Sequence, residues 1–320
     1  MRALDPTTEG FIERAGVRVH YEVYGDGWPA VFLLMPSTIV QSRAWKAQVP
    51  YLARRHRVVL IDPRGNGRSD ASPTPGAHAD RELIDDARAV LDLLGVTEVV
   101  LVGLCDGGAH ALMLAAESPE LVLGVCAINP AVVLVPRTGE QVRPDFDAEL
   151  DEDQGWAKEN RHYWARDWEG YTRFFFDEMF PEPHSSKQRE DCVSWAAGAS
   201  LNAMLNEADA PPSPRHDPEG SVGICRAVTC PVLVIGGSDD RCQPPERARR
   251  VADLTGGDYV VVEGGGHFPQ ARDPVLVNRL LHDFVLRVGH RGRPGPVARD
   301  DELVAEGHAD TAYRLARARL

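Results

Sequence analysis

The sequence lacks the features that mark membrane, secreted and nucleic-acid-binding proteins. Its longest uncharged run, residues 121–136, is shorter than a bilayer span requires and contains Asn129 and Pro130. The first ten residues include acidic residues and a proline instead of an apolar segment, so no signal peptide is predicted. Basic residues are outnumbered, 35 Lys and Arg against 48 Asp and Glu, which disfavours nucleic acid or an anionic membrane as a partner. We therefore expect a cytoplasmic protein that binds neither.

Patterns that hold metals or form disulfide frameworks are also missing. There are six cysteines, none in a Cys-x-x-Cys pair or a tight group with histidine. A zinc site is therefore not predicted, and the thiols are expected to be reduced. No nucleotide, flavin or metal motif rises above chance, so we expect no cofactor. The cysteines are Cys105, Cys126, Cys192, Cys225, Cys230 and Cys242.

Strand and helix signals alternate along most of the chain. Its 320 residues, 43% of them hydrophobic, suit one large α/β domain with an inserted part. Residues 11–14 and 17–24 are β-rich runs joined by Ala15 and Gly16, which is typical of a hairpin. The alternation downstream predicts a mostly parallel sheet covered on both faces. The predicted strands are 30–35, 57–61, 98–102, 121–128, 232–235 and 259–262, and the predicted helices are 40–54, 79–94, 106–118, 245–254 and 274–288.

This alternation stops between Asn129 and Arg226, in a mainly helical stretch that is rich in aromatic residues. We predict that residues 131–226 form a helical cap on a core made of residues 1–130 and 227–288. Most of the cap's aromatic residues are expected to pack together, with Trp164 and Phe175 facing the substrate. Residues 289–320 are predicted to be a Gly/Pro/Arg-rich linker and a short helix. The sequence leaves open whether the chain forms a homo-oligomer.

The segment VVLVGLCDGG, residues 99–108, carries the strongest functional signal. An apolar, β-branched run precedes Cys105, and a helical pattern follows it. A nucleophile at a sharp turn between strand and helix needs glycine two residues away on either side, and Gly103 and Gly107 occupy these positions. Cys105 is therefore predicted to be a nucleophile at a strand-to-helix turn, where serine is the usual residue.

Such a nucleophile needs a base and an acid that orients the base. Asp240 lies on the loop after strand 232–235, and His267 lies on a Gly-rich loop after strand 259–262. Both loops are expected at carboxyl ends of strands, where their side chains reach the site. We predict His267 as the general base and Asp240 as the acid. Asp239 is the alternative acid, and its other role would be to stabilise a turn.

Taken together, these motifs resemble the α/β-hydrolase superfamily over about residues 10–288. The loop DPRGNGRS, residues 62–69, is similar to the family's DxRGxGxS loop. The acid loop and the GGGHFP loop at residues 264–269 are similar to the loops that carry the family's triad. The resemblance implies an α/β-hydrolase fold, with an eight-stranded, mostly parallel sheet flanked by helices and an inserted helical cap.

The chain departs from the family at the loop after the third strand. Family members usually have His-Gly there, whereas this chain has Met35, Pro36, Ser37 and Thr38. Pro36 has no N–H to donate. By resemblance, the oxyanion hole would use the backbone N–H of Asp106 and that of Ser37, with Thr38 as the alternative second donor. Met35 and Thr38 are also predicted to line the substrate pocket.

The second departure is the cysteine itself. A helix N-terminus and a nearby histidine are expected to lower the pKa of the Cys105 thiol, whereas the Asp106 carboxylate would raise it if it pointed inward. We therefore expect Asp106 to point outward or to bind a partner. Two other interpretations remain: Cys105 is a buried apolar residue in an inactive enzyme, or Asp106 is the nucleophile. The glycine spacing disfavours Asp106, because Leu104 would then stand where glycine is needed.

A Cys-His-Asp set with an oxyanion hole is equipped for acyl transfer from a small-molecule acyl substrate. The leading hypothesis is a hydrolase acting on an ester, thioester or lactone through an acyl-cysteine intermediate. One alternative is an acyltransferase or thioesterase acting on a carrier- or coenzyme-bound acyl group. The other is a non-catalytic binding protein, which the presence of His267 and Asp240 disfavours.

Overall fold

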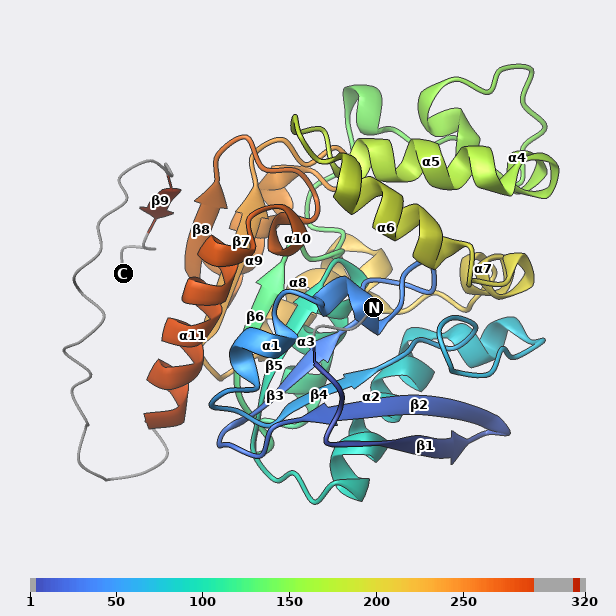
Figure 1. Cartoon of the computed structure of the whole chain (residues 1–320). Coiled ribbons are helices and arrows are strands. Elements are labelled where there is room, and N and C mark those ends of the chain that lie inside the picture. Colours follow the sequence, from blue (N-terminus) through green and yellow to red (C-terminus); the bar gives the residue numbers. More distant parts are fainter. Residues whose placement is uncertain (1–3, 291–312, 317–320) are drawn as a thin grey trace.

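A single twisted sheet forms the centre of the molecule. The computed structural model describes residues 4–290 and 313–316, and within these residues nine strands pair in the order β1-β2-β4-β3-β5-β6-β7-β8-β9 (Figure 1). Neighbouring strands from β4 to β8 in this order are parallel, whereas β1 with β2, β2 with β4, and β8 with β9 are antiparallel. The predicted mostly parallel sheet is confirmed in β1 to β8. The strands are β1 (Thr8–Arg14), β2 (Val17–Tyr24), β3 (Ala30–Leu34), β4 (Val58–Ile61), β5 (Val99–Leu104), β6 (Val122–Ile128), β7 (Val232–Gly237), β8 (Asp258–Val262) and β9 (Tyr313–Ala316).

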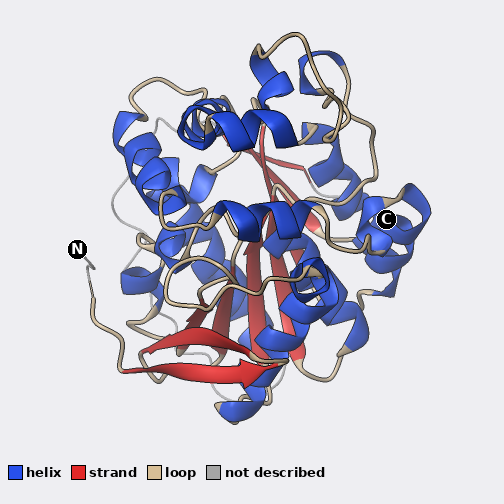
Figure 2. Cartoon of the chain, turned by 90° about the vertical axis from the view of Figure 1, so that its right-hand side faces the viewer, coloured by secondary structure: helices blue, strands red, loops and turns tan. Residues whose placement is uncertain are grey.

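Helices cover both faces of this sheet (Figure 2). Helices α1 and α11 pack on one face through residues such as Leu52 and Phe284. The other face is covered by α2, α3, α8 and α9, which contribute residues such as Ile84 and Leu112 to a second core. The helices of this layer structure are α1 (Val49–Leu52), α2 (Asp80–Leu93), α3 (Asp106–Glu117), α8 (Pro218–Ala227), α9 (Pro245–Thr255), α10 (Pro269–Arg272) and α11 (Pro274–His290).

The central strand β5 shows why the apolar run at residues 99–102 is continuous. Val99 and Leu101 point into the core beneath α3, whereas Val100 and Val102 point into the core beneath α11. All six residues of β5 are buried. A strand between two helical layers has no polar face, so it loses the alternation seen in half-exposed strands. This strand ends at the predicted nucleophile.

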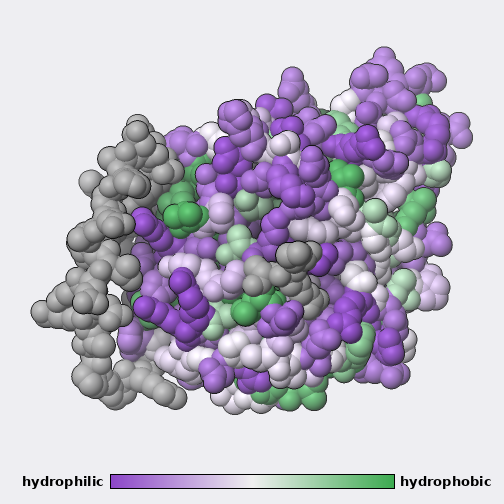
Figure 3. Space-filling model, viewed as in Figure 1, coloured by the Kyte–Doolittle hydropathy of each residue, from purple (hydrophilic) through white to green (hydrophobic). Residues whose placement is uncertain are grey.

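Between β6 and β7 the chain forms further helices that lie over the carboxyl ends of the parallel strands (Figure 1). Their aromatic rings contact one another: the ring centroid of Trp164 lies 4.9 Å from that of Phe146, 5.4 Å from that of Trp168 and 4.8 Å from that of Tyr171. On the face in Figure 3, hydrophobic residues are scattered among hydrophilic ones. The aromatic residues therefore serve mainly as internal packing. These helices are α4 (Arg161–Arg166), α5 (Trp168–Met179), α6 (Ser186–Ala196) and α7 (Leu201–Ala208).

The structure corrects the predicted helix over residues 40–54. Residues Ser42–Trp45 form one short 3₁₀ turn, and α1 begins separately at Val49. Pro50 is the physical reason, because it has no N–H for an intrahelical hydrogen bond and is tolerated only in the first turn of a helix.

The C-terminal segment also differs from the predicted helix. Residues Tyr313–Ala316 form β9, which pairs antiparallel with β8. The free edge of β8 offers unpaired N–H and C=O groups, so a nearby segment gains hydrogen bonds by adding a strand. The rest of the predicted linker and helix, residues 291–312 and 317–320, lies outside the described residues. No helix in the part of the chain that the structure covers is long and apolar enough to cross a bilayer.

Candidate active site

Cys105 lies at the tip of the turn between β5 and α3. Its backbone has φ 53° and ψ −117°, a region that a residue with a Cβ rarely adopts. The turn closes only because its flanks lack side chains: a Cβ on Gly103 would lie 2.0 Å from the Gly107 carbonyl oxygen, and one on Gly107 would lie 2.5 Å from the Met35 oxygen. The sequence prediction of a sharp strand-to-helix turn is thus confirmed in its geometry. The turn holds the Cys105 thiol at the end of the sheet.

His267 and Asp240 lie together on the neighbouring loops. The Nδ1 atom of His267 is 2.7 Å from Oδ2 of Asp240, and both side chains are 1% exposed. The other Asp240 oxygen accepts hydrogen bonds from the backbone N–H groups of Cys242 (2.8 Å) and Gln243 (3.0 Å). These two donors fix the carboxylate in position. Asp239, the alternative acid, instead lies on the surface, 52% exposed and 3.8 Å from Arg241.

Asn129, at the end of β6, joins the two loops. Its side-chain NH₂ donates to the backbone oxygens of Gly266 (3.2 Å) and His267 (2.9 Å), and its side-chain oxygen accepts from the N–H of Gly237 (3.0 Å). One buried amide therefore holds both loops against the sheet.

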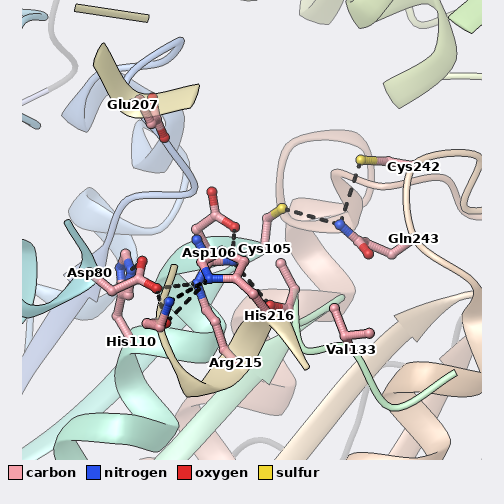
Figure 4. Close-up of polar contacts among 12 residues, drawn as sticks. Asp80, Cys105, Asp106, His110, Val133, Glu207, Arg215, His216, Cys242 and Gln243 are labelled. Atoms are coloured by element: carbon pink, nitrogen blue, oxygen red, sulfur yellow. Dashed lines mark hydrogen bonds and ion pairs between the residues drawn. The ribbon is translucent and has the colours of Figure 1, made fainter. Parts of the chain in front are cut away.

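A second thiol, that of Cys242, lies beside Cys105. The two thiols are close enough for each to shift the pKa of the other. The side-chain nitrogen of Gln243 lies 4.0 Å from each sulfur, as Figure 4 shows. His267 Nε2 makes no hydrogen bond of normal geometry within the described residues, although its ring is close enough to the Cys242 thiol for each to favour the charged form of the other. The site therefore contains two thiols, one histidine and one carboxylate.

The charges of these groups depend on one another. Burial alone would lower the pKa of His267, but Asp240 and Cys242 outweigh it and raise this pKa to about 10. The neighbouring Cys105 thiol, together with His267, brings the pKa of Cys242 well below its ordinary value. The Cys242 thiol, burial and Asp106 raise the pKa of Cys105. The expected lowering of the Cys105 pKa is therefore wrong for the resting site, because the lowered pKa lies on Cys242 and two adjacent thiolates would repel each other.

Asp106 binds a partner, which is one of the two outcomes expected from the sequence. Its Oδ1 atom lies 2.7 Å from Nη1 of Arg215, whose Nε lies 2.6 Å from Asp80 (Figure 4). The Asp80 carboxylate also binds His110. Arg215 therefore neutralises much of the charge that Asp106 would otherwise direct at Cys105.

The backbone donors predicted for an oxyanion hole are free. Within the described chain, the N–H groups of Asp106 and Ser37 donate to no protein acceptor. The N–H of Thr38 instead donates to Oε2 of Glu207 at 3.2 Å. This contact removes the alternative donor and leaves Ser37 as the second candidate. Burial, and then the nearby Asp106 charge, raise the pKa of Glu207 to about 7.

These groups open into a cavity of about 420 Å³. Ser37, Cys105, Asp106 and His267 line it, and so do Trp164 and Phe175 from the inserted helices. Asp240 lies behind His267 and does not line it. Met35 and Thr38 also do not line it: Met35 packs in the core, and Thr38 is 2% exposed. The turn at Pro36 and Ser37 directs those two side chains inward.

Sequence reasoning missed Cys242, Gln243 and Arg215 as members of the site. For Cys242 and Gln243, the only indication in the sequence was their position two and three residues after Asp240. Nothing in the sequence pairs Arg215 with Asp106. For metals, one group among the described residues, Glu9 with His20 and Glu22 outside the cavity, brings possible ligand atoms within 4.8 Å of one another. Arg68 already binds Glu9, so an ion pair accounts for this group.

Comparison with known proteins agrees with this geometry. The model of the α/β hydrolase fold family matches residues 27–274. The chain belongs to the α/β-hydrolase family. It is 26% identical to the provisionally named carbamate hydrolase RutD of Variovorax paradoxus over 86% of this chain and 99% of that one. It is 25% identical to epoxide hydrolase 4 of Mus musculus, over 86% of this chain and 78% of that one.

Solved structures extend the comparison to three dimensions. The hydrolase superposes with a TM-score of 0.68 and 25% identity on Est816, described as an N-acyl homoserine lactone degrading enzyme, over 86% of this chain and all of that one. The eight-stranded α/β-hydrolase architecture implied by the motifs is confirmed, with β9 as an addition at its edge. The protein is an α/β-fold hydrolase.

Proposed function

We propose that this hydrolase cleaves an ester, thioester or lactone through an acyl-cysteine intermediate on Cys105, with His267 and Asp240 completing the triad. The observation that carries the proposal is the position of the Cys105 sulfur, which lies on a strained turn in the cavity next to the free N–H of Asp106. That N–H and the one of Ser37 would stabilise the negative oxygen of a tetrahedral intermediate.

The reaction divides into two steps. Cys105 sulfur attacks the carbonyl carbon, and its proton passes to the Cys242 thiolate, the neighbouring thiol whose pKa is well below its ordinary value. The leaving alcohol or thiol departs with a proton from the His267 imidazolium. Water then attacks the thioester and gives one proton back to the imidazole. The C–S bond breaks, the acid leaves, and the Cys105 sulfur takes its proton back from Cys242, which restores the Cys242 thiolate. Each step moves a proton between groups that already share the site.

This scheme gives Cys242 and Gln243 roles as well. Cys242 accepts the nucleophile's proton, so Cys105 needs no low pKa of its own in the resting enzyme. The amide of Gln243 lies 4.0 Å from both sulfurs and can donate to whichever one is negative. We propose that both residues position and charge the nucleophile rather than react with substrate.

Relatives support a carbonyl substrate. RutD is named as a carbamate hydrolase, and Est816 is described as degrading a lactone. Carbamates and lactones are both attacked at a carbonyl carbon. Epoxide hydrolase 4 differs by name, and in this chain Cys105 rather than Asp106 occupies the tip of the turn.

The second candidate function is acyl transfer to an amine, alcohol or thiol, including thioesterase action on a carrier- or coenzyme-bound acyl group. The presence of a cysteine at the tip of the turn favours it, because the intermediate would be a thioester. Thioesters react more readily with amines and thiols than oxygen esters do. The same inserted helices that we propose as a cap would have to exclude water for transfer to prevail.

The test is the mass of the intact protein after brief exposure to an activated acyl ester at neutral pH. Wild type should gain one acyl group, Cys105→Ala should gain none, and His267→Ala should gain it slowly. Peptide mapping should place the group on Cys105. Cys230→Ala is the matched control, because Cys230 lies outside the cavity and should leave acylation unchanged.

The Cys242→Ala variant distinguishes the roles of the two cysteines. It should slow acylation but keep Cys105 as the acylated residue. An acyl group mapped to Cys242 in wild type would contradict the proposed nucleophile. Decay of the adduct in water supports hydrolysis, and faster decay on addition of an amine, alcohol or thiol supports transfer. Absence of any adduct across esters, thioesters and lactones would favour a non-catalytic binding protein.

A further inference from the structure

One wall of the catalytic cavity carries three arginines, Arg137, Arg143 and Arg247. Arg247 is only 4% exposed, and within the described residues neither it nor Arg137 forms an ion pair with a carboxylate. A buried cation without a carboxylate is costly, and a Cys242 thiolate would offset only part of that cost for three arginines, which leaves room for a further negative charge from a ligand. The whole chain has a net charge of −13, which makes this concentration of positive charge more unusual.

Only some of the N–H donors of these guanidinium groups are hydrogen-bonded to the protein. Arg137 uses Nε for the backbone oxygen of Cys242 (3.3 Å), and Arg247 uses Nε for that of Val135 (2.7 Å). Arg247 Nη1 donates to the side-chain oxygen of Gln243 at 2.6 Å. Within the described part of the chain, both terminal nitrogens of Arg137 and the Nη2 of Arg247 have no protein acceptor. These donors are held in place and available to a ligand.

Arg143 completes the wall. Its Nε lies 2.9 Å from Glu159, and its Nη1 donates to the backbone oxygen of Gln141. Its Nη2 is buried without a hydrogen-bond partner in the described residues. Among the described residues, Glu159 is the only carboxylate that forms an ion pair with one of the three, so the positive charge exceeds the negative charge there. Burial, and then the charges of Arg137 and Arg143, lower the pKa of Arg247 to about 10, which still leaves it charged at neutral pH.

The wall lies close to the reacting sulfur. The Gln243 amide links them, since its oxygen accepts from Arg247 and its nitrogen is 4.0 Å from Cys105 Sγ. The guanidinium nitrogen of Arg247 and that sulfur are therefore at most about 9 Å apart, because the oxygen and nitrogen of one amide are about 2.3 Å apart. A substrate chain of about four to six bonds between the reacting carbonyl carbon and an anion on this wall fits within that upper limit.

We propose that Arg137, Arg143 and Arg247 form a subsite for a carboxylate of the substrate. In the preferred substrate this carboxylate lies about four to six bonds from the reacting carbonyl. The inference rests on the proposed acyl-cysteine function and specifies its substrate class. A monoester or monothioester of a short dicarboxylic acid has this chemistry. A thioester with an uncharged acyl group and a carboxylate on its leaving group has this chemistry too.

The test compares matched thioesters. In the acyl arm, the N-acetylcysteamine thioester of glutarate is compared with that of pentanoate. In the leaving-group arm, the pentanoyl thioester of 4-mercaptobutyrate is compared with that of butanethiol. We expect kcat/KM in one arm to be at least about tenfold higher for the charged member, as charge-assisted hydrogen bonds from arginine are strong. The arm that shows the preference identifies the half of the substrate that carries the charge.

The variants ask whether the arginines cause the preference. Arg137→Gln should reduce the ratio of charged to neutral kcat/KM about tenfold, and Arg137→Lys should restore part of it, because lysine keeps the charge without the forked donors. Arg241→Gln is the control: Arg241 is 48% exposed, lies outside the cavity and should leave the ratio unchanged. A ratio near one in wild type for both arms, or a ratio unaffected by Arg137→Gln, would overturn the subsite.

Binding without chemistry separates this inference from the proposed function. Glutarate dianion is titrated into Cys105→Ala by calorimetry, with and without Arg137→Gln. Binding that Arg137→Gln weakens supports the subsite even if no thioester acylates the enzyme. Acylation of Cys105 by neutral thioesters, together with no charge preference and no glutarate binding, would leave the proposed function intact and reject the subsite.

Discussion

Replacing Asp240 by asparagine tests the triad at its most constrained contact. The carboxylate accepts from the backbone N–H groups of Cys242 and Gln243 through one oxygen and contacts His267 Nδ1 through the other. In Asp240→Asn the amide oxygen can keep the two backbone hydrogen bonds. The NH₂ group then faces Nδ1 and forces the neutral ring to hold its proton on Nε2. His267 can then no longer take the proton of Cys242, so the charged Cys242–His267 pair from which acylation starts is lost.

The magnitude follows from the charge of the histidine. A rise in the pKa of His267 from 6.5 to about 10 corresponds to about 5 kcal/mol in favour of the charged ring, and Asp240 is the largest favourable contributor. Loss of about 3 kcal/mol of this stabilisation in the transition state would slow acylation roughly a hundredfold. Removing the charge should also raise the pKa of Cys242, because the imidazolium beside it is lost.

The assay is single-turnover acylation followed by protein mass, together with thiol alkylation as a function of pH. Asp239→Asn is the matched control, since it removes the same charge one residue away from an exposed position. We expect Asp240→Asn to be roughly a hundredfold slower and Asp239→Asn to be unchanged within about twofold. Equal rates for wild type and Asp240→Asn, or a loss in Asp239→Asn instead, would refute the assignment of the acid.

Three further predictions concern stability. Gly103→Ala should destabilise the protein by about 3 kcal/mol or more in urea unfolding, since its Cβ would lie 2.0 Å from the Gly107 oxygen. Gly223→Ala in α8 is the control: its Cβ would have nothing within 4 Å, so it should instead stabilise the protein by up to about 1 kcal/mol. Arg215→Gln should lower the free energy of unfolding by about 3–5 kcal/mol, because Asp80 and Asp106 lose their shared partner, and it should slow alkylation of Cys105. Arg226→Gln is the exposed control. Equal unfolding curves for wild type and Arg215→Gln would contradict this role. Glu207→Gln should raise the free energy of unfolding at pH 8 by about 2 kcal/mol. The pKa of Glu207 is raised from 4.5 to about 7, so its ionisation opposes folding increasingly as the pH rises from 4.5 to 7, opposes it fully above pH 7 and has no effect below pH 4.5. A gain that persists at pH 4 would be inconsistent with this cause.

The sequence predicted the parts of the site that depend on local pattern. Cys105, Asp240 and His267 each follow a strand whose apolar run is visible in the sequence, and the ends of adjacent parallel strands meet at one edge. Strand positions therefore determine that these three loops converge. The prediction of their chemistry stays a proposal, but their placement in one site follows from the fold.

Other features depend on contacts between distant residues. Arg215 binds Asp106 from 109 positions away, and no periodicity in either segment indicates the pair. The arginine wall joins Arg137 and Arg143 before the inserted helices to Arg247 on α9, so it exists only after the chain has folded. The helix expected over residues 40–54 had a suitable apolar pattern, but Pro50 restricted where a helix could begin.

The amide of Asn129 has a consequence for how this enzyme can change. Since it ties the acid loop and the histidine loop to β6, these loops behave mechanically as one piece with the sheet. Arg137 and Arg143 belong to the chain after β6, where Arg137 and Gln141 donate to the backbone oxygens of Cys242 and Asp240 on the acid loop. Asn129 holds that loop independently of these donors, so replacing the stretch could exchange the compounds that are accepted while the reactive groups keep their spacing, and reactivity and selectivity can be altered as separate modules.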